Sequence, residues 1–126
     1  MNKQKIIIPL RLPSLNEYTA KCRIQRGTWN AGNDMKRKTQ DELFPYLLQL
    51  PRFTTPIKLN FIWHEKDKRR DLDNVCFAKK FILDAMQECG RLPNDNPKYI
   101  KGFSDEAVYD GKYGVEIIIN EFTEEE

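Results

Sequence analysis

The chain is short of the residues that build zinc sites and disulfide frameworks. Its 126 residues include one histidine and three cysteines, and no two cysteines form a Cys-x-x-Cys pair. Zinc sites use several Cys or His ligands at short spacing, so this composition argues against a zinc centre. Three separated cysteines are typical of small core thiols in a reducing compartment rather than of disulfide partners.

Long apolar runs are also missing from the sequence. The stretch that follows the charged N-terminal residues, 6–8, ends at Pro9, far short of the core of a signal peptide. A membrane-spanning helix needs roughly 20 apolar residues, and no segment approaches that length. We therefore expect a cytoplasmic protein with no membrane contact.

A length of 126 residues, 40% of them apolar, predicts one domain over residues 1–126. Residues 121–126 are acidic, and we expect them to form a flexible tail. The net charge of +2 conceals an asymmetry. Residues 1–80 hold 17 Lys and Arg against 8 Asp and Glu, a net charge of +9, whereas residues 81–126 hold 4 against 11, a net charge of −7. A basic face for nucleic acid and scattered surface lysines both fit this distribution.

Apolar periodicity and turn residues predict the order of the elements. Residues 57–64 place Ile57, Leu59, Phe61 and Trp63 on one face of a strand, with His64 on the other. Further strands are expected at 5–12, 99–109 and 114–122, and helices at 35–50, interrupted by Pro45, and 74–88. Asp110-Gly111 is a strong hairpin signal. The sequence predicts an α+β fold, with a mixed β-sheet, helices packed on one face and a C-terminal β-hairpin.

Residues 16–34 are polar and contain several glycines and asparagines, so we expect a long loop there. Tyr18 and Trp29 lie among the cations of this segment. Aromatic rings beside cations are typical of nucleic-acid surfaces, but both rings could equally pack beneath the loop as a small satellite core.

The most informative motif is Asp71-Leu72-Asp73-Asn74, which follows the basic run 66–70. Carboxylates two residues apart on an extended segment point to the same side, so both could reach one divalent cation. The preceding cations would attract a polyanion. This setting indicates a metal-dependent enzyme that acts on a phosphodiester backbone.

The motif has three other interpretations. Asp is a favoured N-cap residue, so either aspartate could simply cap the next helix. An EF-hand fails because Cys76 stands where the calcium loop needs Gly. The motif also fits the D-x-D-x-V pattern of dehalogenase-like phosphatases, but the basic run replaces the buried strand that precedes the motif in that family.

A third carboxylate and a lysine would complete a metal site. Asp95, in the loop after the helix, is the candidate ligand, although Asn94-Asp95-Asn96-Pro97 equally suits an ordinary turn. At 3.6 residues per turn, Lys80 lies nearly in line with Asp73, whereas Lys79 points towards the edge of the core stripe. We therefore expect Lys80 rather than Lys79 to face the site.

These residues together resemble the RusA family of Holliday junction resolvases, which is common in prophages. The resemblance rests on residues 69–74, on a helix with Lys80 and Leu83-Asp84-Ala85-Met86, and on Leu92-Pro93-Asn94-Asp95 before a strand. Pro13-Ser14-Leu15-Asn16-Glu17-Tyr18 is similar to the first loop of that family. The similarity spans about residues 5–121.

The resemblance implies a homodimer that binds four-way DNA junctions and nicks two opposed strands with Mg²⁺, Mn²⁺ also being accepted. Asp71, Asp73 and Asp95 would be the metal-binding catalytic carboxylates, and Lys80 the catalytic lysine. The segment between Asp73 and Asp84 is longer by three residues than in the best-known member, so an alignment anchored on Asp84 selects Lys80. Phosphate contacts are expected from Asn16, Lys36, Arg37, Lys38, Lys68, Arg69 and Arg70.

Two further functions stay open on the sequence. The chain could be a DNA-binding module without catalysis, in which the aspartates cap a helix and order the basic run. Less consistent with the sequence is a metal-dependent phosphatase that acts on small molecules and is indifferent to DNA.

Overall fold

The apolar alternation of residues 57–65 produces the central strand of the protein, in agreement with the sequence pattern. In the computed structural model, which describes residues 3–94 and 96–122, this strand is β4 (Ile57–Glu65). Its odd-numbered apolar side chains are at most 2% exposed. The sheet also contains β1 (Lys3–Ile8), β5 (Ile100–Tyr109) and β6 (Gly114–Glu121).

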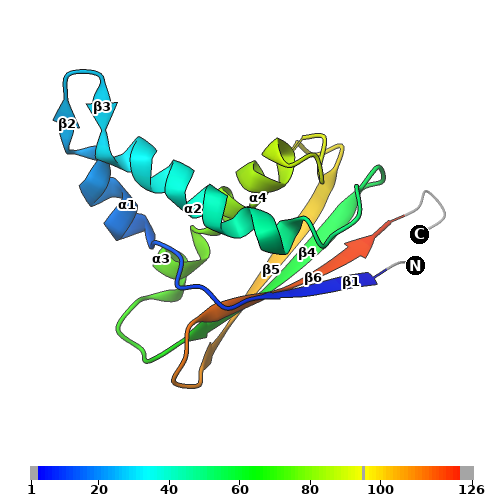
Figure 1. The fold of residues 1–126 in the computed structure, drawn as a ribbon. Coiled ribbons are helices and arrows are strands. Elements are labelled where there is room, and N and C mark those ends of the chain that lie inside the picture. The colour runs from blue at the N-terminus through cyan, green and yellow to red at the C-terminus, as the bar shows by residue number, and fades with distance from the viewer. Residues whose placement is uncertain (1–2, 95, 123–126) are drawn as a thin grey trace.

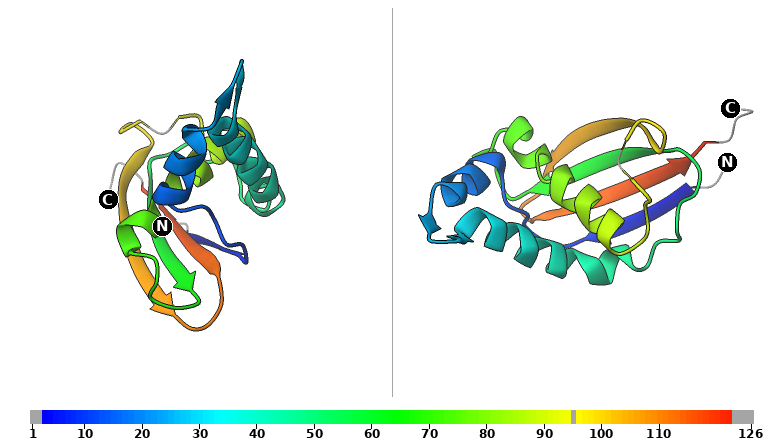
Figure 2. Two further views of the ribbon diagram at one scale, coloured as in Figure 1. Left: turned by 90° about the vertical axis from the view of Figure 1, so that its left-hand side faces the viewer. Right: turned by 90° about the horizontal axis from the view of Figure 1, so that it is seen from above.

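The four strands form a mixed sheet in the order β1-β6-β4-β5 (Figure 1). β4 is parallel to β5 and antiparallel to β6, which in turn is antiparallel to β1. α2 (Ala31–Leu47) and α4 (Lys79–Glu88) cover one face of this sheet (Figure 2). The predicted α+β class, mixed sheet and one-sided helices are confirmed.

The last two strands reverse direction at the predicted place but do not pair with each other. Gly111 takes a φ of +81° in the turn, a conformation that favours glycine. β4 lies between β5 and β6 and forms hydrogen bonds with both. The expected C-terminal hairpin is therefore open, with β4 inserted between its two strands. The helix-facing side of β4 is apolar from Ile57 to Trp63 and buried along its whole length, which suits an inner strand, whereas β5 carries the partly exposed Phe103 and Asp105.

The expected loop at 16–34 is largely structured. It contains α1 (Leu15–Cys22) and a small hairpin of β2 (Gln25–Arg26) and β3 (Trp29–Asn30). Ser14 and Glu17 form a reciprocal capping box at the start of α1. This Ser-x-x-Glu signal is present in the sequence and predicts a helix start, which the polar composition of the segment obscured.

Two helices differ from their predicted bounds. α2 begins at Ala31, because Asn30 caps it by accepting hydrogen bonds from the amides of residues 32 and 33, and it continues through Pro45. The helix expected at 74–88 is divided into α3 (Leu72–Cys76) and α4. At the break, Phe77 packs on Tyr18 and Phe81, which joins α1 to both short helices.

The close approach of α1 and α2 provides a test of the fold. A Cβ added to Gly32 would lie 2.3 Å from the Cys22 Sγ and 3.0 Å from its Cα. We expect Gly32→Ala to lower the free energy of unfolding by about 1–3 kcal/mol, since overpacking forces backbone shifts. The matched control is Gly102→Ala, where an added Cβ has no neighbour within 4 Å. Equal denaturation midpoints for the two variants in guanidinium chloride would contradict this packing.

Candidate functional site

Arg70 connects the basic loop 66–70 to the body of the protein. Its guanidinium donates two hydrogen bonds of 2.7 Å to Glu65, at the end of β4, and one to the Leu12 carbonyl oxygen. Glu65 is only 4% exposed and the Arg70 side chain 15%. Because this bidentate ion pair is buried away from water, it holds the loop 66–70 in one conformation.

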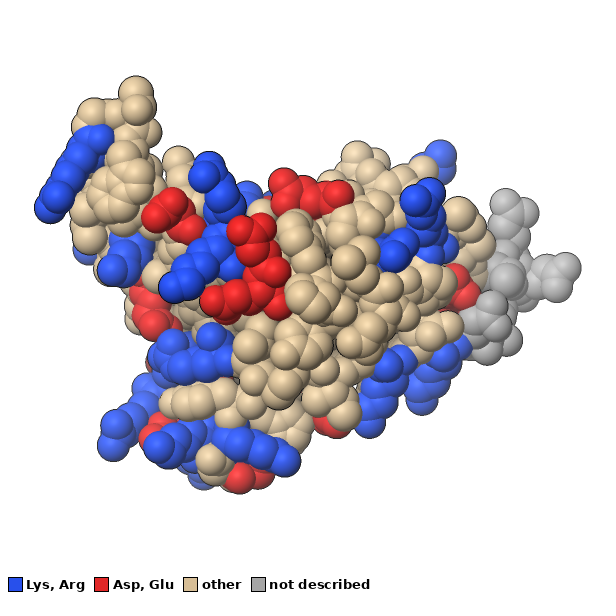
Figure 3. Space-filling view, viewed as in Figure 1, with Lys and Arg blue, Asp and Glu red and all other residues tan. Residues whose placement is uncertain are grey.

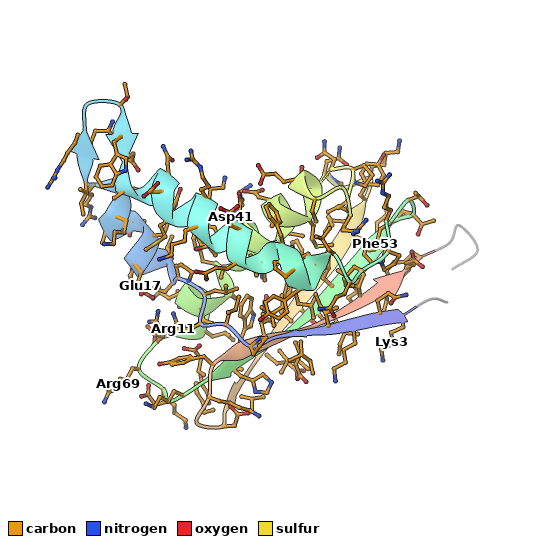
Figure 4. All side chains as sticks on the ribbon, viewed as in Figure 1. Lys3, Arg11, Glu17, Asp41, Phe53 and Arg69 are labelled. Carbon is orange, nitrogen blue, oxygen red and sulfur yellow. The ribbon has the colours of Figure 1, made fainter. Side chains whose placement is uncertain are left out.

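The same guanidinium reaches α1 through Glu17, at 3.1 Å. Glu17 also accepts hydrogen bonds from Arg11 and from the Ser14 amide (Figure 4 shows Arg11 and Glu17 side by side). Partial burial raises the pKa of the Glu17 carboxyl, but the bonds from Arg11 and Ser14 outweigh it and bring the pKa to about 2. Glu17 is therefore ionised at neutral pH and holds both cations.

The prediction that Arg70 binds a phosphate is not supported. Its donors are directed at Glu65, Glu17 and a backbone carbonyl, and its guanidinium also lies 5.7 Å from the ring centre of Tyr113. Arg70 and Arg69 are adjacent, but only Arg69 is on the outside, with 89% of its side chain exposed (Figure 4). Arg70 positions the loop, and Arg69 is available to a ligand.

The other predicted phosphate contacts lie at the surface, except for one. Lys68, Arg37, Lys38 and Asn16 are exposed. Lys36 is partly buried and forms an ion pair with Asp84 at 3.0 Å. In Figure 3, cations gather over the β2–β3 hairpin and over the loop 66–70, at the same end of the molecule. A polyanion that crosses this end could contact both groups.

Asp71 and Asp73 stand at the start of α3, but neither caps it. Asp71 has the extended backbone of an N-cap residue, yet its side chain makes no capping hydrogen bond. Asp73 lies in the first turn and accepts a bond only from the adjacent Asn74 amide. Both carboxylates are exposed, and within residues 3–94 and 96–122 neither has an ion-pair partner. The interpretation that an aspartate side chain caps this helix is therefore wrong.

Asp73 lines an open hollow of about 510 Å³ beside α3 and α4. We call it the α3–α4 hollow. Both candidate lysines, Lys79 and Lys80, line it with Asp73, whereas Asp71 does not. The remaining wall is mostly apolar and consists of Leu15, Cys76, Phe77, Leu83 and Phe103. The structure thus brings a carboxylate and two ammonium groups of the motif to one surface.

Lys79 is held in place by Asp105, a residue that the sequence alone did not indicate. Its ammonium donates a short hydrogen bond to Asp105 of β5, which also accepts a bond from the Trp63 indole at 2.9 Å. The Lys79 ammonium lies 5.1 Å from the ring centre of Phe103. Burial raises the pKa of the nearby Cys76 thiol, Lys79 opposes this, and Asp105 and Asp73 add to it, so all four groups share one electrostatic environment.

Lys80, the expected catalytic lysine, is more exposed than Lys79. Its side chain is 56% exposed and forms an ion pair of 3.3 Å with Asp84, whereas the Lys79 side chain is 20% exposed. The break at Phe77 divides the helix expected at 74–88, so helical phase does not separate the two lysines. Both face the hollow.

Asp95, the expected third ligand, lies outside the described residues. Its neighbours Asn94 and Asn96 follow the C-terminal end of α4, whereas Asp73 precedes its N-terminal end. A ligand role for Asp95 stays a prediction. The described carboxylate that β5 brings to the environment of Asp73 is Asp105.

The donor set fits magnesium better than a metal that needs a full protein cage. In the part of the chain that the structure describes, no three His, Cys, Asp or Glu side chains are grouped as a metal-binding cluster. Mg²⁺ is commonly held by one or two carboxylates together with water and substrate phosphates. Asp71 and Asp73, which are exposed and have no ion-pair partner among the described residues, match that requirement.

His64 lies on the face of the sheet away from the helices, as predicted. Its two ring nitrogens contact Asp110 at 2.7 Å and Glu116 at 3.1 Å. Burial lowers the pKa of His64, but the bonds to Glu116 and Asp110 prevail, so it is raised. His64 joins the β5–β6 turn to the sheet and is separate from the α3–α4 hollow.

No protein-family model matches the chain, and no curated protein matches it either. Among the helices of the described residues, none has the length and apolar character required to cross a membrane.

The Glu65–Arg70 pair gives a direct test of how the site is positioned. Arg70→Gln would leave the buried Glu65 carboxylate without its bidentate partner, and we expect it to cost about 3–5 kcal/mol of unfolding free energy. Arg69→Gln removes the same charge from the exposed neighbour and should change stability by less than about 0.5 kcal/mol. Chemical denaturation of both variants measures the difference. Two equally stable variants would show that Arg70 does not anchor the loop.

Proposed function

We propose that the chain is a Mg²⁺-dependent endonuclease that acts on branched DNA. The observation that carries the proposal is the state of Asp71 and Asp73, which begin α3 without capping it and have no ion-pair partner among the described residues. Exposed like charges two residues apart repel each other, and a bound divalent cation would relieve that repulsion. A purely structural role does not require two such aspartates.

The surroundings of the aspartates favour a phosphodiester substrate. Lys68 and Arg69 lie exposed on the loop that leads into the motif, and Lys79 and Lys80 line the hollow beside Asp73. Cations on both sides of a metal-binding carboxylate pair suit a backbone phosphate, which they would position without reading bases. A small-molecule phosphatase would not need the exposed cations on the loop.

Each residue then has a defined part in strand cleavage. Asp71 and Asp73 would hold the cation, and a bound Mg²⁺ would supply polarisation of the scissile phosphate and a lower pKa for an attacking water. Lys80 stabilises negative charge on the phosphoryl oxygens. Its ion pair with Asp84 is more than half exposed on the lysine side, and such pairs are weak, so a phosphate can compete for the ammonium.

The more specific proposal follows the resemblance to RusA resolvases. A homodimer would cut two opposed strands of a four-way junction, since two-fold symmetry places one active site on each strand. Asp95 would contribute to the metal site, and Mn²⁺ would be accepted as well as Mg²⁺. These features rest on the resemblance and on the motif, and they are tested separately from cleavage.

The test is cleavage of a synthetic four-way junction. We expect Asp71→Asn to reduce Mg²⁺-dependent nicking at least about a hundredfold, because a metal ion contributes several kcal/mol and each 1.36 kcal/mol is tenfold in rate. Junction binding in EDTA should be retained. Asp41→Asn, an exposed aspartate on α2, is the matched control and should cleave like the unaltered protein.

Unchanged cleavage by Asp71→Asn would contradict the proposed site. Junction binding without any metal-stimulated cut, by the unaltered protein, would identify a DNA-binding module instead. Hydrolysis of a generic phosphate ester with no affinity for DNA would favour the phosphatase.

A further inference from the structure

The β2–β3 hairpin projects from the end of the molecule where the cations gather (Figures 1 and 2). We call residues 24–30 the arm. Between the arm, α1 and α2 lies a second hollow of about 400 Å³, the arm hollow. Trp29 and Met35 contribute apolar surface to it, and Arg11, Lys21 and Lys38 contribute positive charge.

The arm is short but firmly attached. Gly27 takes a φ of +59° in the two-residue turn between β2 and β3, as such hairpin turns require. Asn30 donates to the Cys22 carbonyl oxygen and to Gln25, while its own side-chain oxygen caps α2. The Ala31 amide donates to the Ile24 carbonyl oxygen. A held arm presents its side chains without an ordering cost on binding.

Tyr18 and Trp29, which the sequence does not distinguish, lie in different environments in the structure. Tyr18 packs on Phe77 and Phe81 at the margin of the hydrophobic core. Trp29 is 45% exposed, and Ile24 on the same arm is 41% exposed. Among the described residues, no aromatic ring stacks on Trp29. Its indole face is therefore available to a planar ligand.

The charges around the arm hollow favour an anionic ligand. Two carboxylates, Asp34 and Glu42, also line the hollow. These two carboxylates are outnumbered by exposed cations on the arm and on the adjoining turns of α1 and α2. The cations are Lys21, Arg23, Arg26, Arg37 and Lys38. Over the residues that the structure describes, none of these five cations forms an ion pair. Such cations beside an exposed indole can bind the phosphate of a nucleotide while its base stacks.

We propose that the arm hollow binds one unstacked nucleotide of the bound DNA, with its base on Trp29 and its phosphate near Lys21 and Lys38. This inference rests on the proposed DNA substrate and extends it by a second contact, at a distance from Asp73. Bases at a strand crossing or in a single strand can leave the stack more readily than bases in a duplex. The arm hollow thus selects branched or single-stranded DNA over a continuous duplex.

Trp29 fluorescence tests this assignment in EDTA, where cleavage does not occur. The other tryptophan, Trp63, is 2% exposed and bonded to Asp105, so it contributes a constant background. Saturation with a synthetic four-way junction or an oligo-dT strand should quench Trp29 and protect it from acrylamide. A blunt duplex of equal length should do neither.

Substitutions separate the base contact from the phosphate contact. Trp29→Leu should abolish the fluorescence change and weaken junction binding about tenfold, within the range of one base–aromatic stack, while duplex binding changes less. Trp29→Phe should retain part of the affinity. Leu48→Ala, which removes an exposed apolar side chain at the end of α2, is the matched control and should bind normally.

Lys21→Gln with Lys38→Gln should lower the salt slope of junction binding by roughly 0.7 to 0.9, the value for the one phosphate that both lysines contact. Lys58→Gln, an exposed lysine on β4, should leave the slope unchanged. The inference is overturned if Trp29→Leu binds the junction within twofold of the unaltered protein, if duplex quenches Trp29 equally, or if no DNA binds. Quenching without metal-dependent cleavage would uphold it and remove the nuclease proposal alone.

Discussion

The buried pair of Glu65 and Arg70 is the interaction on which the candidate site depends. It ties the last residue of β4 to the loop that leads into the aspartate motif, and Glu17 extends the tie to α1. A charge so deeply buried is tolerated only with a partner, so the loop has little freedom to take another path. Asp71 follows Arg70 directly, and its position is therefore determined by a contact that involves no ligand.

The helix starts of this protein differ in a way that bears on function. Ser14 caps α1 and Asn30 caps α2, each with side-chain hydrogen bonds. Asp71 occupies the corresponding place in α3 and makes none. An Asp is well suited to capping, so an aspartate that leaves the helix uncapped gives up a stabilisation of about 1 kcal/mol. Its carboxylate therefore stays available to a cation.

Local patterns predicted much of the fold and only part of the site. The alternation of β4 is a local property, and it identified the central strand and the side on which His64 lies. Arg69 and Arg70 look equivalent in sequence, because their difference arises from Glu65 and Leu12, which tertiary structure brings to one of them. Asp105 was missed for the same reason, since its contact with Lys79 depends on β5 lying beside β4. The order of the last strands also depends on tertiary structure, because β4 lies between β5 and β6.

The central claim is that Asp71 and Asp73 bind a divalent cation. A crystal of the protein soaked in Mn²⁺, with anomalous diffraction collected at the manganese edge, tests it most directly, because the signal reports only the metal. We predict an anomalous peak within coordination distance of the carboxylate oxygens of both aspartates, lost in Asp73→Asn. A saturated crystal whose peak lies instead at Asp110 and Glu116, or which has no peak beside α3, would contradict the claim.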